Sequence, residues 1–351
     1  METSEAKGFG GGSNLKKRPF ISIIVPAYNA AETLGECLAA LLDQSIPRSE
    51  YEVIVVDDGS TDETQEVAKK CGVRLLSQPN QGPGAARNLG VSQAGGEIIL
   101  FTDADCVPTK EWIEEMIKPF AESGVVAVKG AYRTRQRGLL ARFIQAEFEE
   151  RYALLERERY VDFVDSHSAA YRKVEFLATG GFDPNLLISE DVELSYKLSR
   201  LGHKMIFNPK AIVYHRHPET LWAYFRAKFQ RAYWRTKSYR QHPGKMLKDS
   251  YTPQVLKAQI GLVFLLGLMI PAWLLCERQR PQFFWGMALV GSLFLFTTLP
   301  FAVKVIKRDW LVGLFSPFYL LLRATALGLG FALGFVHQLG EVWRPDGSGR
   351  V

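Results

Sequence analysis

The chain has 351 residues, of which 47% are apolar and 23% are charged, and its formal net charge is +6. This composition excludes an intrinsically disordered chain, and the length leaves room for about two domains. The four cysteines lie far apart with no CxxC spacing, which argues against a zinc site or a disulfide framework and suits a reducing compartment. They are Cys37, Cys71, Cys106 and Cys276.

Residues 1–18 are predicted to form a flexible tail, because they are rich in glycine and contain no apolar segment typical of a signal peptide.

Four apolar, β-branched runs follow: "FISIIVPAYN", "YEVIVVDDGS", "GVRLLSQ" and "EIILFTDADC". Segments with helical periodicity lie between them. This alternation predicts a parallel sheet covered by helices on both faces.

Acidic residues follow two of these predicted strands. Asp57 and Asp58 end one run, and Asp103 and Asp105 end another. In parallel sheets ligands bind beyond the carboxyl ends of the strands, so these acids are expected at a ligand site. Carboxylate oxygens suit Mg²⁺ or Mn²⁺ together with substrate phosphates. The alternative is that the acids only shape turns or cap the following helices.

The second half of the soluble region begins with "GLLARFIQAEFEERYALLERERY", which predicts a long charged helix. This helix either frames an acceptor cleft or presents a solvated face with a packing stripe. Further on, Glu190 and Asp191 open another predicted helix, where a capping role for Asp191 is the alternative to catalysis. His215 and His217 follow the strand "KAIVY"; we consider His215 as a metal ligand and give His217 no such role.

The last third of the chain predicts a membrane region. A segment at about 218–240 interleaves aromatic and basic residues, which favours an interfacial helix on an anionic membrane over a nucleic-acid contact. A basic linker at 241–258 precedes a transmembrane region at 259–340, with spans at about 260–276, 283–303 and 311–336, and a C-terminal tail at 341–351. Thirteen Lys or Arg against two acids between Arg200 and Lys257 predict a cytoplasmic catalytic side.

Arg323 is the single charge in the apolar run from Leu311 to Val336. A guanidinium near the centre of a bilayer is unfavourable by at least about 2.5 to 3.5 kcal/mol, so a span that faces lipid on all sides is not expected. Three explanations stay open: the run lies partly in the interface, neighbouring spans supply carbonyl groups, or Arg323 meets the phosphate of a lipid acceptor.

The motifs "VPAYNAAETL", "VVDDGSTDET", "NQGPGAARNLG" and "FTDADC", in this order, resemble the nucleotide-binding half of family 2 glycosyltransferases. "GGFDPNLLISEDVELSYKLSRLGHKMIFNP" is similar to their acceptor half, so the resemblance covers about residues 20–240. It implies an α/β GT-A fold, a Rossmann-like mixed sheet at 19–240, here followed by the α-helical transmembrane region. It also implies an inverting transfer from a nucleotide-diphosphate sugar, of hexosyltransferase type (EC 2.4), by a bacterial-type, membrane-anchored member.

The resemblance also implies roles for individual residues. Asp191 is the expected general base, with Glu190 on the acceptor side, and Asp105 is the surer ligand of a divalent Mg²⁺ or Mn²⁺, joined by Asp103 and His215. Arg323 is placed on the acceptor side only by its position in the membrane region. The nucleotide-sugar site is expected to contain Pro26, Tyr28, Asn29, Glu32, Asp57, Asp58, Arg87 and Asp103.

Other functions fit the sequence less well. "GPGAAR" follows the third predicted strand and has Arg87 at its sixth position, which argues against a dinucleotide-binding dehydrogenase. A processive polysaccharide synthase would share the soluble half, but its usual QxxRW motif meets Tyr233 at the Arg position of "QRAYW". A catalytically dead scaffold remains the alternative of another class.

Because the predicted interfacial helix and spans hold the acceptor at the membrane surface, the expected acceptor is lipidic. It is a polyprenyl phosphate, a lipid-linked saccharide or a glycolipid at the cytoplasmic membrane, in cell-envelope glycan synthesis, with no nucleic-acid partner.

Overall fold

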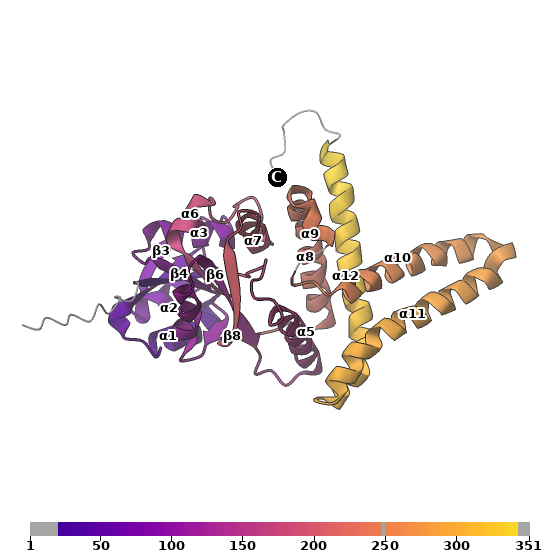
Figure 1. The fold of residues 1–351 in the computed structure, drawn as a ribbon, viewed down its shortest axis with the longest axis horizontal. Coiled ribbons are helices and arrows are strands. Elements are labelled where there is room, and N and C mark those ends of the chain that lie inside the picture. Colours follow the sequence, from indigo (N-terminus) through magenta and orange to yellow (C-terminus); the bar gives the residue numbers. More distant parts are fainter. Residues whose placement is uncertain (1–19, 248–249, 343–351) are drawn as a thin grey trace, which may run out of the picture.

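The structure is a computed structural model that describes residues 20–247 and 250–342. The predicted tail at 1–18 and the last nine residues of the predicted tail at 341–351 lie outside the described residues. The described chain contains an α/β region followed by long helices, which Figure 1 shows as two bodies.

The α/β region is built on an eight-stranded mixed sheet in the order β3-β2-β1-β4-β7-β6-β8-β5. Strands β1, β2, β3 and β4 are parallel, as predicted from the sequence, whereas β7 runs antiparallel between β4 and β6. β8 is parallel to β6, and the short β5 is antiparallel to β8. The strands are β1 (Ile21–Ala27), β2 (Tyr51–Asp57), β3 (Arg74–Ser77), β4 (Ile98–Thr102), β5 (Cys106–Pro108), β6 (Val125–Arg133), β7 (Ser168–Arg172) and β8 (Lys204–His215).

This topology brings functional residues to one edge of the sheet. The carboxyl ends of β1, β2, β4, β6 and β8 all point to that edge, because these strands are mutually parallel through the antiparallel β7. The amino end of β7 lies at the same edge. Asp57, Asp103, His167 and His215 therefore gather there although they are distant in sequence.

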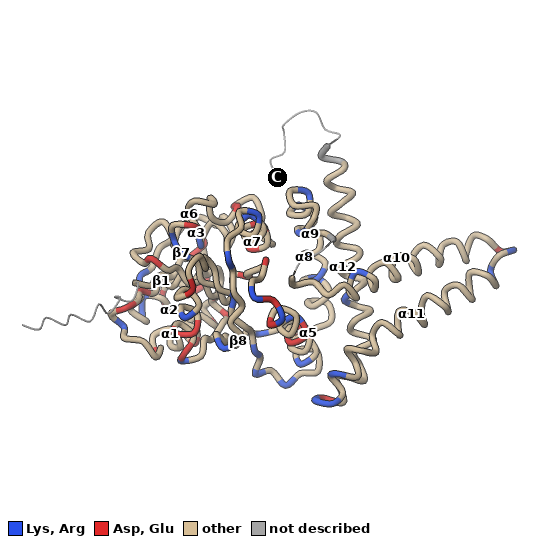
Figure 2. The backbone as a smooth tube through the Cα atoms, in the orientation of Figure 1, with Lys and Arg blue, Asp and Glu red and all other residues tan. Residues whose placement is uncertain are grey.

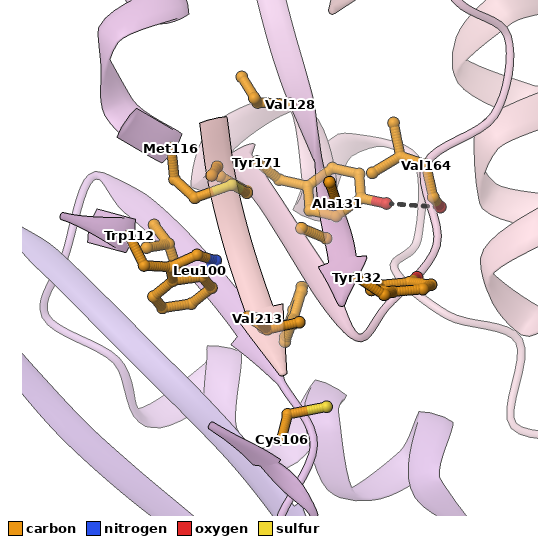
Figure 3. Packing of buried hydrophobic residues seen from close by; sticks show 14 of the residues in the cluster. Leu100, Cys106, Trp112, Met116, Val128, Ala131, Tyr132, Val164, Tyr171 and Val213 are labelled. Atoms are coloured by element: carbon orange, nitrogen blue, oxygen red, sulfur yellow. Dashed lines mark hydrogen bonds between the residues drawn. The ribbon is translucent and has the colours of Figure 1, made fainter. Parts of the chain in front are cut away.

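Helices cover the sheet and close its core. They are α1 (Ala31–Leu42), α2 (Thr64–Lys70), α3 (Pro83–Gln93), α4 (Trp112–Ile117), α5 (Leu139–Leu155), α6 (Lys173–Ala178) and α7 (Glu190–Arg200). Apolar side chains from β4, β6, β7 and β8 pack with Trp112 and Met116 of α4 (Figure 3). Trp112 is fully buried, and its indole N–H donates to Ser168 Oγ at 2.9 Å, so its polar group is satisfied inside the core.

The remaining helices form the second body. They are α8 (Leu221–Gln241), α9 (Pro243–Leu247), α10 (Gln254–Leu275), α11 (Arg280–Ile306) and α12 (Trp310–Val342). Three of these segments, 254–275, 277–306 and 310–339, are long and apolar enough to be candidate membrane spans, which agrees with the three spans predicted. Figure 2 shows charged residues at the tip of the α10–α11 hairpin, and the chain turns there through Glu277–Gln279.

The three candidate spans are not equivalent. Figure 1 shows α10 and α11 extending as a hairpin away from the α/β region, whereas α12 crosses the base of this hairpin and runs beside α8. Only 6% of the most apolar part of α10 is buried, against 44% of the corresponding part of α12. Much of the apolar surface of the hairpin therefore has no protein partner among the described residues.

Glycines allow α12 to approach α8 closely. A Cβ at Gly330 would lie 2.2 Å from the Phe229 carbonyl oxygen, and a Cβ at Gly334 would lie 2.6 Å from Thr236 Oγ1. Small residues four positions apart permit this kind of close helix packing. The backbone of α8 is thus held against α12 along its length, which fixes the position of the basic residues that α8 carries.

Candidate active site

A cavity of about 860 Å³ lies between the carboxyl edge of the sheet and the helices of the second body. At one end its lining comes from the ends of β1, β2 and β4, and at the other from α8, α10 and α12. It therefore connects the predicted nucleotide-sugar residues with helices that are candidate membrane spans.

The predicted nucleotide-sugar residues divide into two groups. The members that line the cavity are Pro26, Tyr28, Asp58, Arg87 and Asp103. Asn29, Glu32 and Asp57 do not line it: Glu32 is exposed, and Asn29 has a φ of 48° and accepts a hydrogen bond from Thr61 N at 2.8 Å. The structure thus brings five of the eight residues to one cavity.

The acids of "VDDGS" order the loops around the cavity. Asp57 is fully buried and accepts from Ser60 N and from Gln65 Nε2. Asp58 accepts from the backbone N–H groups of Gln81 and Gly82 at 2.9 and 2.8 Å. Asp58 therefore fastens the start of α3, which carries Arg87, to the end of β2.

Arg87 links the two acidic motifs. Its guanidinium donates to Asp103 Oδ1 at 2.6 Å and to Glu190 Oε1 at 2.7 Å, and its side chain is 3% exposed. His167 Nε2 lies 3.5 Å from the other oxygen of Asp103. Burial opposes ionisation of Asp103, but His167 and Arg87 outweigh it and lower the pKa of Asp103 to about 2. Asp103 is thus an ionised carboxylate whose oxygens face two basic side chains.

The candidate metal ligands come from the turn between β4 and β5, the start of β5 and the end of β8. Asp105, Cys106 and His215 have ligand atoms that all lie within 4.8 Å of one another, and Asp105 Oδ2 is 3.5 Å from His215 Nε2. Burial and the neighbouring His167 lower the pKa of His215 to about 4, so the imidazole is neutral at pH 7 and able to bind a metal.

This donor set fits Mg²⁺ or Mn²⁺ through two of its three members. A carboxylate and a neutral imidazole suit these ions, and donor phosphates complete such sites. Cys106 fits less well, because its sulfur is soft and burial together with Asp103 raises the pKa of its thiol. Cys106 is instead part of the apolar core (Figure 3). His217 belongs to the packing as well, since its ring stacks on Phe148 with a centroid distance of 5.5 Å.

Asp191 and Glu190 open α7 at the cavity wall. Asp191 Oδ1 accepts from Val192 N at 2.7 Å, and its Oδ2 accepts from Ser166 N at 3.3 Å. Burial and the nearby Asp165 raise the pKa of Asp191, which strengthens it as a base. Burial and the adjacent Asp191 likewise raise the pKa of Glu190 to about 7, although Glu190 is paired with Arg87. The hydrogen bond from Ser166 N orients the Asp191 carboxylate, and this contact is additional to a capping role at the start of α7.

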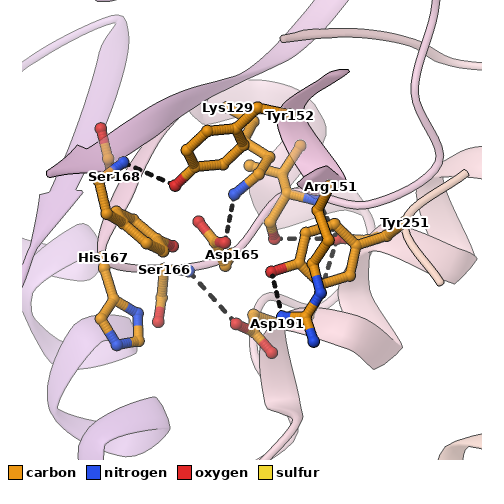
Figure 4. Close-up of polar contacts among 12 residues, drawn as sticks. Lys129, Arg151, Tyr152, Asp165, Ser166, His167, Ser168, Asp191 and Tyr251 are labelled. Carbon is orange, nitrogen blue, oxygen red and sulfur yellow. Dashed lines mark hydrogen bonds and ion pairs between the residues drawn. The ribbon is translucent and has the colours of Figure 1, made fainter. Parts of the chain in front are cut away.

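Asp165 and its partners were not identified from the sequence. Asp165 is buried, forms an ion pair with the fully buried Lys129, and leaves its Oδ1 without a partner among the described residues. Figure 4 shows Lys129, Asp165 and Asp191 in one polar cluster with Arg151 and Tyr251. The only signal in the sequence was the polar run from Asp165 to His167 directly before β7, and no periodicity links this run to Lys129.

Arg323 has a different environment from those expected. Its guanidinium donates to Glu147 Oε1 of α5 at 2.9 Å and to Gln259 Oε1 of α10 at 3.0 Å, and it is 3% exposed. The partners are side chains rather than backbone carbonyls of neighbouring spans. Since a carboxylate of the α/β region pairs with it, a lipid phosphate is not needed to explain the burial of this cation. Arg323 does not line the cavity, so its acceptor-side role stays a prediction that these contacts disfavour.

Comparisons with known proteins show which proteins the chain resembles. The family described as Glycosyl transferase family 2 matches residues 22–178. Glycosyltransferase AglE of Haloferax volcanii is 42% identical over 118 residues, which are 32% of this chain and 39% of that protein. The probable glycosyltransferase YdaM of Bacillus subtilis is 28% identical over 237 residues, 63% of this chain and 56% of that protein. The chain thus spans between two fifths and three fifths of the length of these relatives.

Solved structures extend the likeness over nearly the whole chain. The mannosyltransferase PcManGT of Pyrobaculum calidifontis, solved with GDP-Man and Mn²⁺, aligns with a TM-score of 0.60 at 19% identity, covering 92% of this chain and 89% of that chain. Residues 1–349 of TarS from S. aureus align with a TM-score of 0.50 at 21% identity, covering 94% and 95%. At these identities the likeness concerns the fold alone, and it confirms the mixed-sheet GT-A fold predicted from the sequence.

Proposed function

We propose that the protein is a family 2 glycosyltransferase, since that family's model matches residues 22–178, and that it moves a sugar from a nucleotide-diphosphate sugar to a membrane-associated acceptor, with inversion at the anomeric carbon. The acceptor is a polyprenyl phosphate, a lipid-linked saccharide or a glycolipid, and the product serves cell-envelope glycan synthesis. One observation carries the proposal: a single cavity is lined by Asp103, by Asp191 and by the candidate membrane helices α10 and α12.

On the donor side, Asp58 and the loop that it orders form one wall, and Pro26 and Tyr28 form another. Asp103 is held by Arg87 and stays ionised, so it can accept hydrogen bonds from the sugar or ribose hydroxyls. A Mg²⁺ or Mn²⁺ ion bound by Asp105, with Asp103 and His215 beside it, would neutralise charge on the diphosphate leaving group.

On the acceptor side, Asp191 acts as the general base. An acceptor oxygen attacks the anomeric carbon, its proton passes to the Asp191 carboxylate, and the bond to the diphosphate breaks with its electron pair on the leaving oxygen. A single displacement of this kind inverts the anomeric configuration and needs one base but no covalent nucleophile. The raised pKa of Asp191 and its hydrogen bond from Ser166 suit this task.

The membrane arrangement follows from the second body. The exposed, apolar α10–α11 hairpin is the part best suited to cross the bilayer, whereas α12 and α8 lie across its base, where an interfacial position explains their mixed surfaces. The excess of Lys and Arg before α10 and the cations Lys304, Lys307 and Arg308 after α11 favour the catalytic side as cytoplasmic. The enzyme thus works as a multi-pass protein of the cytoplasmic membrane.

The test is a donor screen with the full chain purified in detergent, in which release of nucleoside diphosphate is measured from UDP, GDP and dTDP sugars with Mg²⁺ or Mn²⁺. The expected result is release from at least one donor, increased by an extract of membrane lipids, with the product sugar in the opposite anomeric configuration. Absence of release from all donors, with and without lipid, would contradict the proposal and favour a catalytically dead scaffold.

A further inference from the structure

The charge of the cavity lining changes sign between its two ends. All the acids among the described lining residues belong to the α/β region; they are Asp58, Asp103, Asp165, Glu190 and Asp191. The lining contributed by α8 and by residues 251–260 contains Lys228, Arg231, Arg235 and Lys257, and no acid. The half of the cavity next to the membrane helices is therefore built for an anion.

The buried cations of this half and of the adjoining helix α5 are only partly compensated. Arg151 is 7% exposed, and its one hydrogen bond among the described residues is to the neutral Tyr251 hydroxyl at 3.3 Å. Lys228 is 5% exposed and shares the single carboxylate of Glu147 with Arg323, at 3.1 and 2.9 Å. The acids beside these cations are Glu147 and the half-buried Glu150, against Arg151, Lys228, Arg231 and Arg323. Burial of positive groups without an equal number of negative ones is unfavourable, so a site of this kind gains by binding an anion.

The pKa of Lys228 supports a local excess of positive charge. Burial lowers it to about 7, and although Glu147 opposes this change, repulsion from Arg151, Arg231 and Arg323 adds to it. The exposed Arg231 lines the cavity one turn along α8 from Lys228 and has no ion pair with any described residue. Arg151 of α5 and Lys228 and Arg231 of α8 thus line the same part of the cavity.

The wall beyond these cations is apolar. Leu256 and Ile260 of α10 and Leu327 and Phe331 of α12 continue the lining toward the candidate membrane helices. A ligand that fills both parts has an anionic head and an apolar chain. The planar guanidinium groups of Arg151 and Arg231 suit a phosphate, whose oxygens accept paired hydrogen bonds.

We propose that this half of the cavity binds the acceptor through a phosphate group, held by Arg151, Lys228 and Arg231, with the apolar chain leaving between α10 and α12. The acceptor is then a phosphate-bearing amphiphile and not a neutral glycolipid. This inference rests on the proposed function, which leaves both classes open, and it places the phosphate on the same cavity wall as Asp191 (Figure 4).

The test measures binding by calorimetry to the full chain in a neutral detergent, without any nucleotide sugar. The probes are citronellyl phosphate, citronellol and inorganic phosphate, which separate the contributions of head and chain. Citronellyl phosphate is expected to bind at least about tenfold more tightly than either of the others, because charge-assisted hydrogen bonds and apolar burial both contribute. Equal binding of citronellol would overturn the phosphate site, and equal binding of inorganic phosphate would overturn the lipid acceptor.

Two variants locate the site. Arg151→Gln and Arg231→Gln are each expected to weaken citronellyl phosphate binding by about 10- to 100-fold while leaving citronellol unchanged. Arg231 is exposed, so its variant is informative even if loss of the buried Arg151 impairs folding. The matched control is Arg159→Gln, which removes the same charge from a side chain that is 76% exposed and outside the cavity. The proposal is contradicted if Arg231→Gln binds citronellyl phosphate with unchanged affinity and Arg151→Gln, once shown to be folded, does so as well.

A competition experiment separates this site from the donor site. Saturating nucleoside diphosphate with Mn²⁺ is expected to leave citronellyl phosphate bound, because the proposed donor site lies at the end of the cavity lined by Asp58 and Asp103. Displacement would mean that these cations bind the donor, which overturns the inference. Phosphate-selective binding without turnover of any donor would contradict the proposed function alone, and donor turnover without phosphate selectivity would contradict the inference alone.

Discussion

Glu147 provides a quantitative test of how the α/β region is attached to the membrane helices. Its carboxylate lies in α5, is 1% exposed, and pairs with Arg323 of α12 at 2.9 Å and with Lys228 of α8 at 3.1 Å. Tyr224 also donates its hydroxyl to this carboxylate at 2.9 Å. Substitution Glu147→Gln keeps the size of the side chain but removes the charge that compensates two buried cations.

The expected loss of stability follows from this burial. Removing one partner of a buried ion pair destabilises a protein by about 3 to 5 kcal/mol, because the remaining charge has no compensation. Lys228 relieves part of this loss, since its pKa is already lowered to about 7 by burial and it can release its proton. We therefore expect about 3 kcal/mol at pH 8 and a larger loss at pH 6, where Lys228 stays charged. For a chain of 351 residues, a loss of 3 kcal/mol corresponds to a decrease in melting temperature of about 4 °C.

The assay is thermal unfolding of the purified full chain in detergent, with Glu149→Gln as the matched control. Glu149 lies on the same helix and pairs with Arg133 and Arg308, but these three side chains are between 31% and 69% exposed. Exposed pairs of this kind contribute about 0 to 1 kcal/mol. Equal melting temperatures for Glu147→Gln and Glu149→Gln at both pH values would refute the assigned role of Glu147 as the buried link between the two bodies.

Three further outcomes are expected. Asp105→Ala should abolish the metal requirement together with turnover, a transition-state loss of several kcal/mol, and unchanged metal-dependent turnover would remove Asp105 from the metal site. Because the pKa of folded Glu190 is raised to about 7 from 4.5, the folded state holds a proton that the unfolded state releases, so stability falls as pH rises through this interval, by at most about 3 kcal/mol. In Glu190→Gln melting temperatures should vary less between pH 5 and 8; an unchanged pH profile would show that another group is responsible. Gly330→Ala should destabilise the packing of α8 on α12 by about 1 to 3 kcal/mol, because the new Cβ would lie 2.2 Å from a backbone oxygen. The control Gly267→Ala should not, because a Cβ at Gly267 meets nothing within 4 Å. Equal melting temperatures for the two variants would contradict the close approach of α8 and α12.

Features that depend on local pattern could be predicted from the sequence. The four parallel strands are continuous apolar runs that end in turn-forming or acidic residues, so both the strands and the position of Asp57 and Asp103 at their ends followed from periodicity and topology rules. The three apolar helices likewise followed from length and composition. The antiparallel β7 did not, because strand direction is set by tertiary pairing.

Features that depend on contacts between distant segments could not be predicted. The sequence indicated that Arg87 lies near the nucleotide, but not that it joins Asp103 to Glu190, which is 103 residues away. Nor does any periodic pattern relate Glu147 to Arg323, 176 residues later. The charged helix α5 was left with two interpretations, a frame for the cleft or a solvated face with a packing stripe. Its Phe148 and Arg151 line the cavity, whereas its Glu149 is partly exposed. Ion pairs of this type form only when the tertiary fold brings complementary side chains together.

The central claim is that Asp191 is the base of a glycosyl transfer reaction, and one measurement tests it most directly. The variant Asp191→Asn keeps the shape of the side chain and its oxygen acceptor for Ser166 N, but it has no affinity for the proton. In a purified full chain with its preferred donor, we predict that transfer falls by roughly 10²- to 10⁴-fold while the dissociation constant of the donor stays near its original value. Transfer at the original rate, or a loss of donor binding that accounts for the whole decrease, would contradict the assignment.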